Sequence, residues 1–304
     1  MSKGIHRFAL LVACATFLLI IAGANVTSHD AGLATSDWPR SNGTFFPKMV
    51  GNLFWEHGHR IVATGVGILT IVLAVYLQIR ERRSWVKRLG WVALGGVIAQ
   101  GLLGGLTVKL NLPLAVSAAH ATLAQLFFLI TVSLAVFTSR NWVTPESTVN
   151  ESGGGVSLRT LCVLALAVIL TQLVLGATLR HSATWDQDLP TGLLLSHVGG
   201  AIAVTMVLGS TVAITLLRHR TEKYLTRPAL IAAALLFVQL LLGLAAYIAR
   251  LASPYDPQPL TPMVSVTVAH VGCGALVFAT TIVLTLRVFR VLRVDRREYV
   301  LAPA

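Results

Sequence analysis

The sequence predicts an all-α integral membrane protein whose eight transmembrane helices form two pseudo-symmetric four-helix bundles. The composition is the first reason: of 304 residues, 55% are hydrophobic and 12% are charged, and the mean hydropathy is +0.75. Soluble domains carry about 25% charged residues, so the composition excludes a water-soluble protein. The other two reasons are the recurrence of apolar segments of membrane-spanning length and the repetition of short motifs between the two halves of the chain.

The apolar segments define the expected helices, because a helix needs about 20 apolar residues to cross the hydrocarbon core. The first segment follows Lys3 and Arg7, as a signal peptide would. It exceeds the roughly 7–15 apolar residues of such a signal, so we expect a retained helix. The expected spans are 8–26, 61–79, 89–108, 114–138, 161–179, 193–217, 229–249 and 263–286.

The distribution of basic residues predicts the orientation of these helices. Eighteen of the 24 Lys and Arg residues fall on the side that holds both ends of the chain, and six fall on the other side. Cytoplasmic loops carry such an excess. We therefore expect a multi-pass protein of the cell (inner) membrane with both termini in the cytoplasm. The net charge of +12 then reflects topology within membrane lipid and predicts no nucleic-acid partner.

Repeated motifs divide the chain into two halves. The spacing Gln-x3-Gly recurs at Gln100, Gln172 and Gln239, and the segment SHVGGA at 196–201 is similar to AHVGCGA at 269–275. A Gly-rich stretch between the halves is typical of a flexible linker. The expected organisation is an N-terminal four-helix bundle at 1–140, a cytoplasmic linker at 141–158 and a C-terminal four-helix bundle at 159–304.

Ionisable groups inside membrane spans are the main functional candidates, because burying them in hydrocarbon is costly. Four histidines meet this description, one in every second expected span and each near its outer end: His59, His120, His197 and His270. A single membrane histidine can simply make an interhelical hydrogen bond. Pairs of imidazoles at one depth are typical of axial haem ligation. Apart from Glu56, no carboxylate or Cys at this depth could complete a zinc or copper site, so the pattern favours haem iron.

Symmetry predicts one haem in each half. His59 and His120 would ligate the iron of the first haem, and His197 and His270 that of the second. Pairing across the two bundles would satisfy the same depths and stays open.

Four basic residues are candidates for pairing with the haem propionates, because they lie at the outer ends of the helices, where positive charge is otherwise scarce. They are Arg60, Lys109, Arg180 and Arg250. Ordinary snorkelling of long basic side chains to the membrane interface is the alternative.

One acidic residue distinguishes the halves. Glu56 and His59 are three residues apart and share a helical face, whereas no acidic residue precedes His197 at the same offset. This asymmetry favours a carboxylate that acts on the first haem, while the second haem is only retained. A solvated Glu at a helix N-terminus is the alternative. His57 faces another direction on the helix and is expected at the membrane interface.

These residues resemble the haem A synthase family of the CtaA type. The likeness extends over the whole chain. Its most specific parts are Glu56-x-x-His59-Arg60 and the outer-loop motif GLATSDWP at 32–39, followed by NGTFFP at 42–47 and single histidines in the later even-numbered spans. The resemblance implies eight helices in two related bundles, with the substrate haem O in the N-terminal half and haem b in the C-terminal half.

The resemblance also implies an activity and the roles of individual residues. The enzyme would oxidise the C8 methyl group of haem O to a formyl group, giving haem A for terminal oxidases. His59 and His120 would flank haem O, His197 and His270 would ligate haem b, and Glu56 would be the catalytic carboxylate. Haem O synthase would deliver the substrate, and an electron acceptor that the sequence does not identify would take up the electrons.

The chain departs from the family pattern in its outer loops. Many bacterial relatives carry Cys near the tryptophan–proline motif and in a later outer loop, but residues 36–41 and 180–192 contain none. A mechanism that depends on a loop disulfide or thiol relay is therefore in doubt for this chain. Two other functions compete with the enzyme: a non-catalytic dihaem electron carrier or haem chaperone, and a transporter built from repeats, for which the positions of the histidines near one face are atypical.

Overall fold

The computed structural model describes residues 3–143, 149–151, 156–182, 189–252 and 259–294. Within these ranges, eight helices are long and apolar enough to cross a membrane, and each expected span corresponds to one of them. The predicted fold class is therefore confirmed. The helices of the first half are α1 (Lys3–Ser28), α2 (Asn52–Arg80), α3 (Ser84–Lys109) and α4 (Leu114–Phe137); those of the second half are α6 (Leu158–Ser182), α7 (Thr191–Arg218), α8 (Lys223–Ala252) and α9 (Thr261–Val291).

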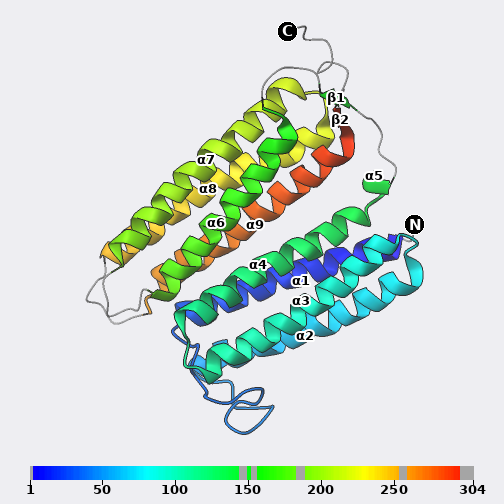
Figure 1. Cartoon of the computed structure of the whole chain (residues 1–304). Coiled ribbons are helices and arrows are strands. Elements are labelled where there is room, and N and C mark those ends of the chain that lie inside the picture. Colours follow the sequence, from blue (N-terminus) through cyan, green and yellow to red (C-terminus); the bar gives the residue numbers. More distant parts are fainter. Residues whose placement is uncertain (1–2, 144–148, 152–155, 183–188, 253–258, 295–304) are drawn as a thin grey trace.

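The eight helices form two bundles that lie side by side (Figure 1). In the first bundle, α1 packs on α2, α2 on α3, α3 on α4 and α4 on α1, so α2 and α4 stand at diagonal corners. The second bundle closes in the same way through α6, α7, α8 and α9, with α7 and α9 at diagonal corners. The four membrane histidines lie on these two diagonal pairs of helices.

The two bundles meet along α1, α4, α6 and α9. Phe17 of α1 and Phe128 of α4 stack with ring centres 5.9 Å apart, and they pack with Ala275 and Ala279 of α9. Gly272 of α9 allows this close approach, because a methyl group there would lie 2.6 Å from Cδ1 of Ile21. This part of the interface is thus apolar and tightly packed, like the interior of each bundle.

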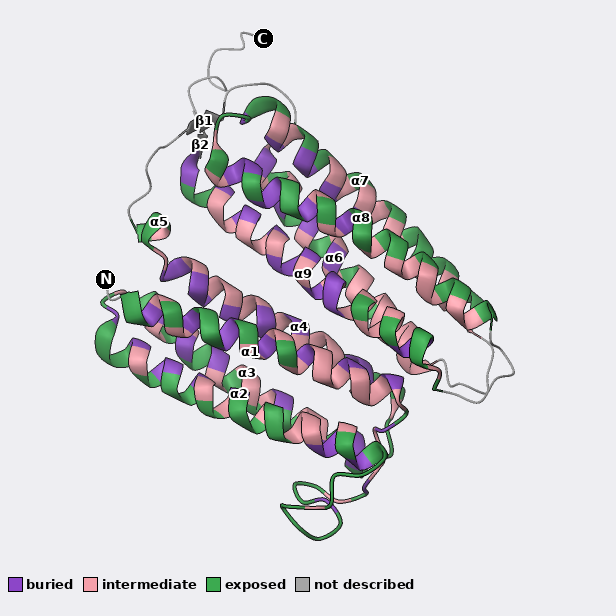
Figure 2. Cartoon of the chain, turned by 180° about the vertical axis from the view of Figure 1, so that it is seen from behind, coloured by how far each residue is buried: buried purple, intermediate pink, exposed green. Residues whose placement is uncertain are grey.

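The outward faces of the helices remain apolar and exposed, as Figure 2 shows by the exposed residues along both bundles. Leu217 is 79% exposed, Ile79 71% and Met206 67%. Such faces are unfavourable in water and favourable in hydrocarbon. The hydroxyl groups of membrane-embedded Thr and Ser, such as Thr16 and Thr70, donate to the carbonyl one turn earlier in their own helix, which removes the cost of an unpaired polar group.

The start of α1 and the end of α9 lie at the same end of the bundles (Figure 1). Near this end, α5 (Arg140–Val143) follows α4, and the strand β1 (Val149–Glu151) pairs in parallel with β2 (Leu292–Val294). The expected flexible linker therefore contains a short helix and a strand, whereas residues 144–148 and 152–155 of it lie outside the described ranges. In the part of the chain that the structure describes, these two three-residue segments are the only β-strands.

Candidate functional site

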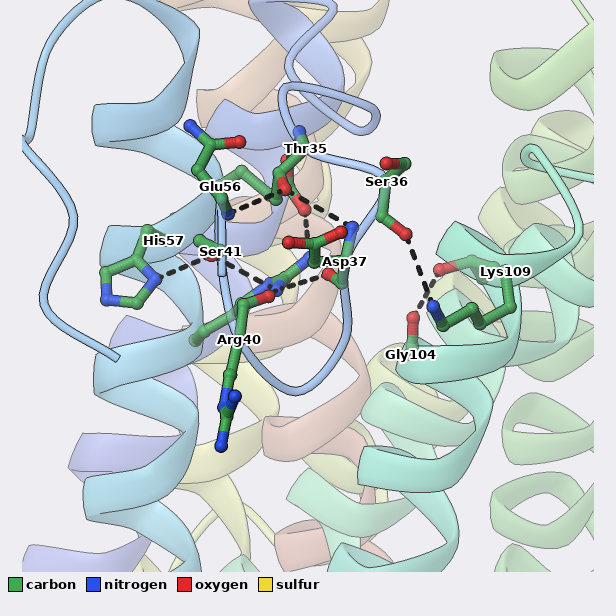
Figure 3. Close-up of polar contacts among 12 residues, drawn as sticks. Thr35, Ser36, Asp37, Arg40, Ser41, Glu56, His57, Gly104 and Lys109 are labelled. Carbon is green, nitrogen blue, oxygen red and sulfur yellow. Dashed lines mark hydrogen bonds and ion pairs between the residues drawn. The ribbon is translucent and has the colours of Figure 1, made fainter. Parts of the chain in front are cut away.

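The outer loop, named after its predicted side of the membrane, comprises residues 29–51, connects α1 to α2, and contacts the first turns of α2 and the end of α3. Trp38 lies flat against Gly105 of α3, where a methyl group would lie 2.6 Å from the indole ring. Nζ of Lys109, at the end of α3, lies 3.5 Å from the main-chain oxygen of Ser36 (Figure 3). The tryptophan–proline motif therefore fixes the loop to the helix that precedes His120.

Glu56 and Arg60 anchor this loop to α2. One carboxylate oxygen of Glu56, Oε2, accepts the main-chain N–H of Thr35 at 2.9 Å, and the other pairs with Arg60 (Figure 3). The guanidinium of Arg60 also donates to the main-chain oxygens of Asp37 and Arg40, at 2.9 and 2.8 Å. Glu56 is buried although it stands near the start of its helix, so the solvated alternative is wrong.

His57 also contributes to this anchor. Its ring shares a hydrogen bond of 2.9 Å between Nδ1 and the hydroxyl of Ser41, and both residues are buried (Figure 3). The loop places Ser41 against His57, so this histidine is covered by protein near the start of α2, and its position at the membrane interface stays a prediction. Thr35 and Ser41 are polar loop residues whose roles depend on this tertiary contact; Thr35 lies within the GLATSDWP motif, but the motif predicts no role for either residue.

Each of the four membrane histidines packs its ring against a glycine of the preceding long helix. In every case Cε1 is the nearest ring atom, followed by Nδ1 and Nε2. A methyl group on the glycine would lie 3.1 Å from Cε1 for Gly23 and His59, 3.1 Å for Gly104 and His120, 2.9 Å for Gly176 and His197, and 3.0 Å for Gly243 and His270. The same local arrangement thus occurs four times, and only a residue without a side chain leaves space for it.

The surroundings of these rings fit axial ligation of haem. Each histidine is half-buried, yet its Nδ1 is fully buried without a hydrogen-bond partner. The ring centres of His197 and His270 are 6.4 Å apart. A ligating imidazole nitrogen lies about 2 Å from its metal and the ring centre about 1 Å beyond, so two imidazoles sharing one iron have centres about 6 Å apart. The diagonal pair of the second bundle meets this requirement.

The corresponding residues of the first bundle, His59 and His120, stand on α2 and α4, at the diagonal corners that α7 and α9 occupy in the second bundle. Within the described ranges, no three His, Cys, Asp or Glu side chains gather closely enough to hold a bare metal ion. The glycine contacts and diagonal positions of His59 and His120 thus match those of His197 and His270, whose spacing fits a shared iron.

Three glutamines approach the histidines. Their shared Gln-x3-Gly spacing is visible in the sequence, but it predicts no role for them. Nε2 of Gln100 donates to the main-chain oxygen of His120 at 2.9 Å, and Gln172 does the same for His197. Nε2 of Gln172 also lies 3.5 Å from Nε2 of the His197 ring, and the corresponding distance for Gln239 and His270 is 3.3 Å. Their position inside membrane spans could have indicated a role in the site, because an amide group in a membrane span needs a hydrogen-bond partner.

The basic candidates lie in different surroundings. Arg60 and Lys109 contact the outer loop, as described above. Arg180 crosses between the bundles: its Nη2 donates to the hydroxyl of Ser28 at 2.5 Å and lies 3.4 Å from the main-chain oxygen of Ala24, both on α1. Arg250 lies in the last turn of α8. These contacts leave the propionate assignment of all four a prediction.

Comparisons with known proteins agree with the motifs of the sequence. Residues 49–187 match the family model described as COX15-CtaA, cytochrome oxidase assembly protein. The chain is 30% identical to haem A synthase of Symbiobacterium thermophilum over 229 residues, which cover 68% of this chain and 74% of that protein. It is also 36% identical to haem A synthase of Lysinibacillus sphaericus over 108 residues, or 33% of this chain and 34% of the relative. For haem A synthase of a Caulobacter species, the identity is 32% over 126 residues, or 37% and 36% of the two chains.

Proposed function

Because this chain belongs to the COX15-CtaA family of cytochrome oxidase assembly proteins, we propose that it is a haem A synthase, a membrane enzyme of haem A biosynthesis. Its substrate is haem O, and the reaction oxidises the C8 methyl group of haem O to a formyl group. Haem O synthase delivers the substrate, and terminal oxidases receive the product. Relatives that carry the name haem A synthase support this proposal.

The observation that carries the proposal is the histidine–glycine arrangement repeated in both bundles, with His197 and His270 at the spacing of two iron ligands and a carboxylate three residues before His59. In the second bundle, Leu194 and Thr267 stand three residues before the two histidines, where α2 has Glu56 before His59. The two haem sites are therefore chemically different. A site with a carboxylate can take up protons during an oxidation, and a site without one is suited to retaining its haem.

In this proposal, His197 and His270 hold haem b, and bound haem b supplies one-electron transfer. His59 and His120 hold the substrate haem O. Gly23 and Gly104 leave the space in which those two rings lie. Apolar side chains around both pairs exclude water from the porphyrin, and basic residues at the outer ends of the helices pair with the propionates.

Glu56 is the proposed proton acceptor for oxidation of the methyl group. The side chain stands nearly one helical turn from His59 and is buried. Its contacts with Thr35 and Arg60 orient the carboxylate and prevent rotation away from the site. Conversion of the methyl group to a formyl group with water as the oxygen source releases four protons and four electrons. An electron acceptor takes up the electrons, and a proton acceptor held in one orientation assists each step.

A host that makes haem O but not haem A provides the test. The full chain is expressed there, and the extracted haems are identified by mass. We expect haem A with the natural chain, and a loss of at least about 100-fold with Glu56→Gln, which keeps the size of the side chain and an acceptor for Thr35. The purified Glu56→Gln variant should retain its haem, as judged by its visible spectrum.

The same experiment separates the enzyme from a non-catalytic dihaem carrier. A carrier would bind haem and yield no haem A, whether or not Glu56 is replaced. Full production of haem A by Glu56→Gln would leave the enzyme standing but remove Glu56 from the reaction. Arg40→Gln serves as the matched loop control, because Arg40 contributes only its main-chain oxygen to Arg60 and should produce haem A normally.

A further inference from the structure

Three of the four membrane histidines have a glutamine partner on the preceding helix, and the fourth has none at the corresponding position. Gln100, Gln172 and Gln239 each stand four residues before the glycine that underlies a histidine. In α1, the residue four positions before Gly23 is Leu19, which packs against the apolar core of the first bundle. His59 therefore has the same glycine contact as the other histidines and lacks the amide.

The glutamines have hydrogen-bonding capacity that the protein alone does not satisfy. Oε1 of each of the three is buried without a partner, as is Nδ1 of each histidine. In the second bundle, the contact between these side chains joins the amide nitrogen of the glutamine and Nε2 of the histidine, 3.5 Å apart for Gln172 and His197 and 3.3 Å apart for Gln239 and His270. An imidazole that ligates a metal through one nitrogen carries a proton on the other, and an acceptor for that proton fixes the ring and strengthens the ligand.

We propose that Gln100, Gln172 and Gln239 are positioning residues that fix His120, His197 and His270 toward haem iron, and that Leu19 leaves His59 as the one releasable ligand. This inference rests on the proposed function. Haem b in the second bundle would lie between two fixed imidazoles and stay bound. A haem in the first bundle would lie between one fixed and one releasable imidazole, as suits a substrate that must leave as product.

Two further glycines of the second bundle, Gly200 and Gly274, support the distinction between fixed and releasable histidines. Oε1 of Gln172 is so close to Gly200 that a methyl group there would lie 2.1 Å from it, and a methyl group on Gly274 would lie 3.1 Å from Nε2 of Gln239. Each of these glycines stands one helical turn after a histidine, so α7 and α9 make room for the amide at the level of the ring. In α2, the residues one turn after His59 are Val62 and Ala63, so this helix has no glycine at the corresponding position.

Haem release from the full-length protein measures this difference directly. Chains that carry His197→Ala with His270→Ala, or His59→Ala with His120→Ala, are loaded with haemin in detergent so that only one bundle holds haem. Transfer to excess apomyoglobin then gives the release rate. In the first background, Leu19→Gln should slow release about tenfold relative to Leu19→Met, its apolar control of similar shape. In the second background, Gln239→Met should accelerate release about tenfold.

A spectroscopic readout distinguishes positioning from a general effect on packing. Loss of the amide weakens the imidazole as a ligand, so Gln239→Met should raise the reduction potential of the remaining haem while the low-spin spectrum persists. Equal release from Leu19→Gln and Leu19→Met would overturn the role of Leu19. Unchanged release and potential in Gln239→Met would overturn the role of the glutamines.

The proposed function and this inference fail separately. If the variants release haem as expected but the natural chain makes no haem A, the enzyme proposal fails and the ligand assignment stands. If haem A is made but release rates do not depend on the glutamines, only the inference fails. A full chain that binds no haemin would overturn both.

Discussion

At the scale of single residues, the glycines beneath the histidines decide whether an imidazole can enter the bundle. Gly176 and Gly243 lie so close to Cε1 of His197 and His270 that even a methyl group would meet the ring at 2.9 or 3.0 Å. In the proposed haem sites, such a displacement of the ring would shift its nitrogen relative to the iron. The two partners of a ligand pair therefore depend on residues that have no functional group at all.

Replacement of Gly243 by Ala should test this dependence. The added methyl group would push His270 away, and we expect haem occupancy of the purified protein to fall roughly tenfold. Gly209→Ala is the matched control, because Gly209 also lies within a membrane helix and nothing lies within 4 Å of its side-chain position. Absorbance of haem per protein chain gives the measurement. Equal occupancy in the two variants would contradict the role of the glycine.

The residues of the site were predictable to different degrees. The four histidines and Glu56 stand out in the sequence because ionisable groups are rare in membrane spans. The burial of His57 and the contacts of Thr35 and Ser41 were not predictable, because they depend on how a loop of irregular conformation folds back onto α2. The glutamines were visible as a spacing, but only the packing of adjacent helices shows that each approaches a histidine.

At the scale of elements, the turn between α2 and α3 contains a partly buried ion pair outside the membrane-spanning segments. Nε and Nη2 of Arg83 donate to the two carboxylate oxygens of Glu81, at 3.0 and 2.8 Å, and Arg83 also donates to the main-chain oxygen of Phe137 at the end of α4. The hydrogen bonds from Arg83 hold the pKa of Glu81 at about 2, below its ordinary value of 4.5. The pair thereby joins three helices at one end of the bundle.

This shift predicts a loss of stability in acid. A carboxylate whose pKa is lowered by folding stabilises the protein above its unfolded pKa, and the contribution disappears as the pH falls through the folded pKa. Between about pH 5 and pH 2, the natural chain should therefore lose on the order of 1–3 kcal/mol that Glu81→Gln does not lose. Denaturant titrations in detergent at several pH values measure this. Parallel pH curves for the two chains would contradict the assignment.

Aromatic and basic side chains extend this connection toward the second bundle. Arg83 lies over the ring of Trp85, which contacts Phe137, and Phe137 in turn contacts Trp142 of α5. Arg290 near the end of α9 lies over Trp142 and donates to its main-chain oxygen at 3.1 Å. The short helix α5 thus ties α3 and α4 to α9, which explains why part of the expected linker has a defined structure.

At the scale of the whole molecule, a group of polar contacts around the buried Ser28 joins the two bundles near the end of α1. Ser28 of α1 accepts a hydrogen bond from Arg180 of α6 and shares another, of 3.2 Å, with the hydroxyl of Thr267 on α9. Arg180 follows Gly176, and its second contact is Ala24, which follows Gly23. The link therefore connects the helix turns that support His197 and His59.

Removal of the Ser28 hydroxyl should weaken the association of the two bundles. In Ser28→Ala, the guanidinium of Arg180 loses a buried partner, which should cost about 1–3 kcal/mol. Ser196→Ala is the control, because Ser196 is exposed and bonds only within its own helix. Denaturant titrations in detergent should show a lower midpoint for Ser28→Ala alone. Identical midpoints for the two variants would show that the contact does not stabilise the assembly.

The sequence by itself determined the membrane class, the eight helices and the family. These follow from composition, from apolar segments of fixed length and from local motifs, all of which are properties of consecutive residues. It also placed the histidines on alternate helices, because helix order is a property of the chain.

Only the tertiary structure decided which helices stand at diagonal corners, which glycine lies beneath each ring and which glutamine reaches it. The physical reason is that the bilayer selects apolar helices without distinguishing one apolar face from another. Van der Waals packing and a few interhelical hydrogen bonds then choose the neighbours, and these contacts join residues far apart in the chain.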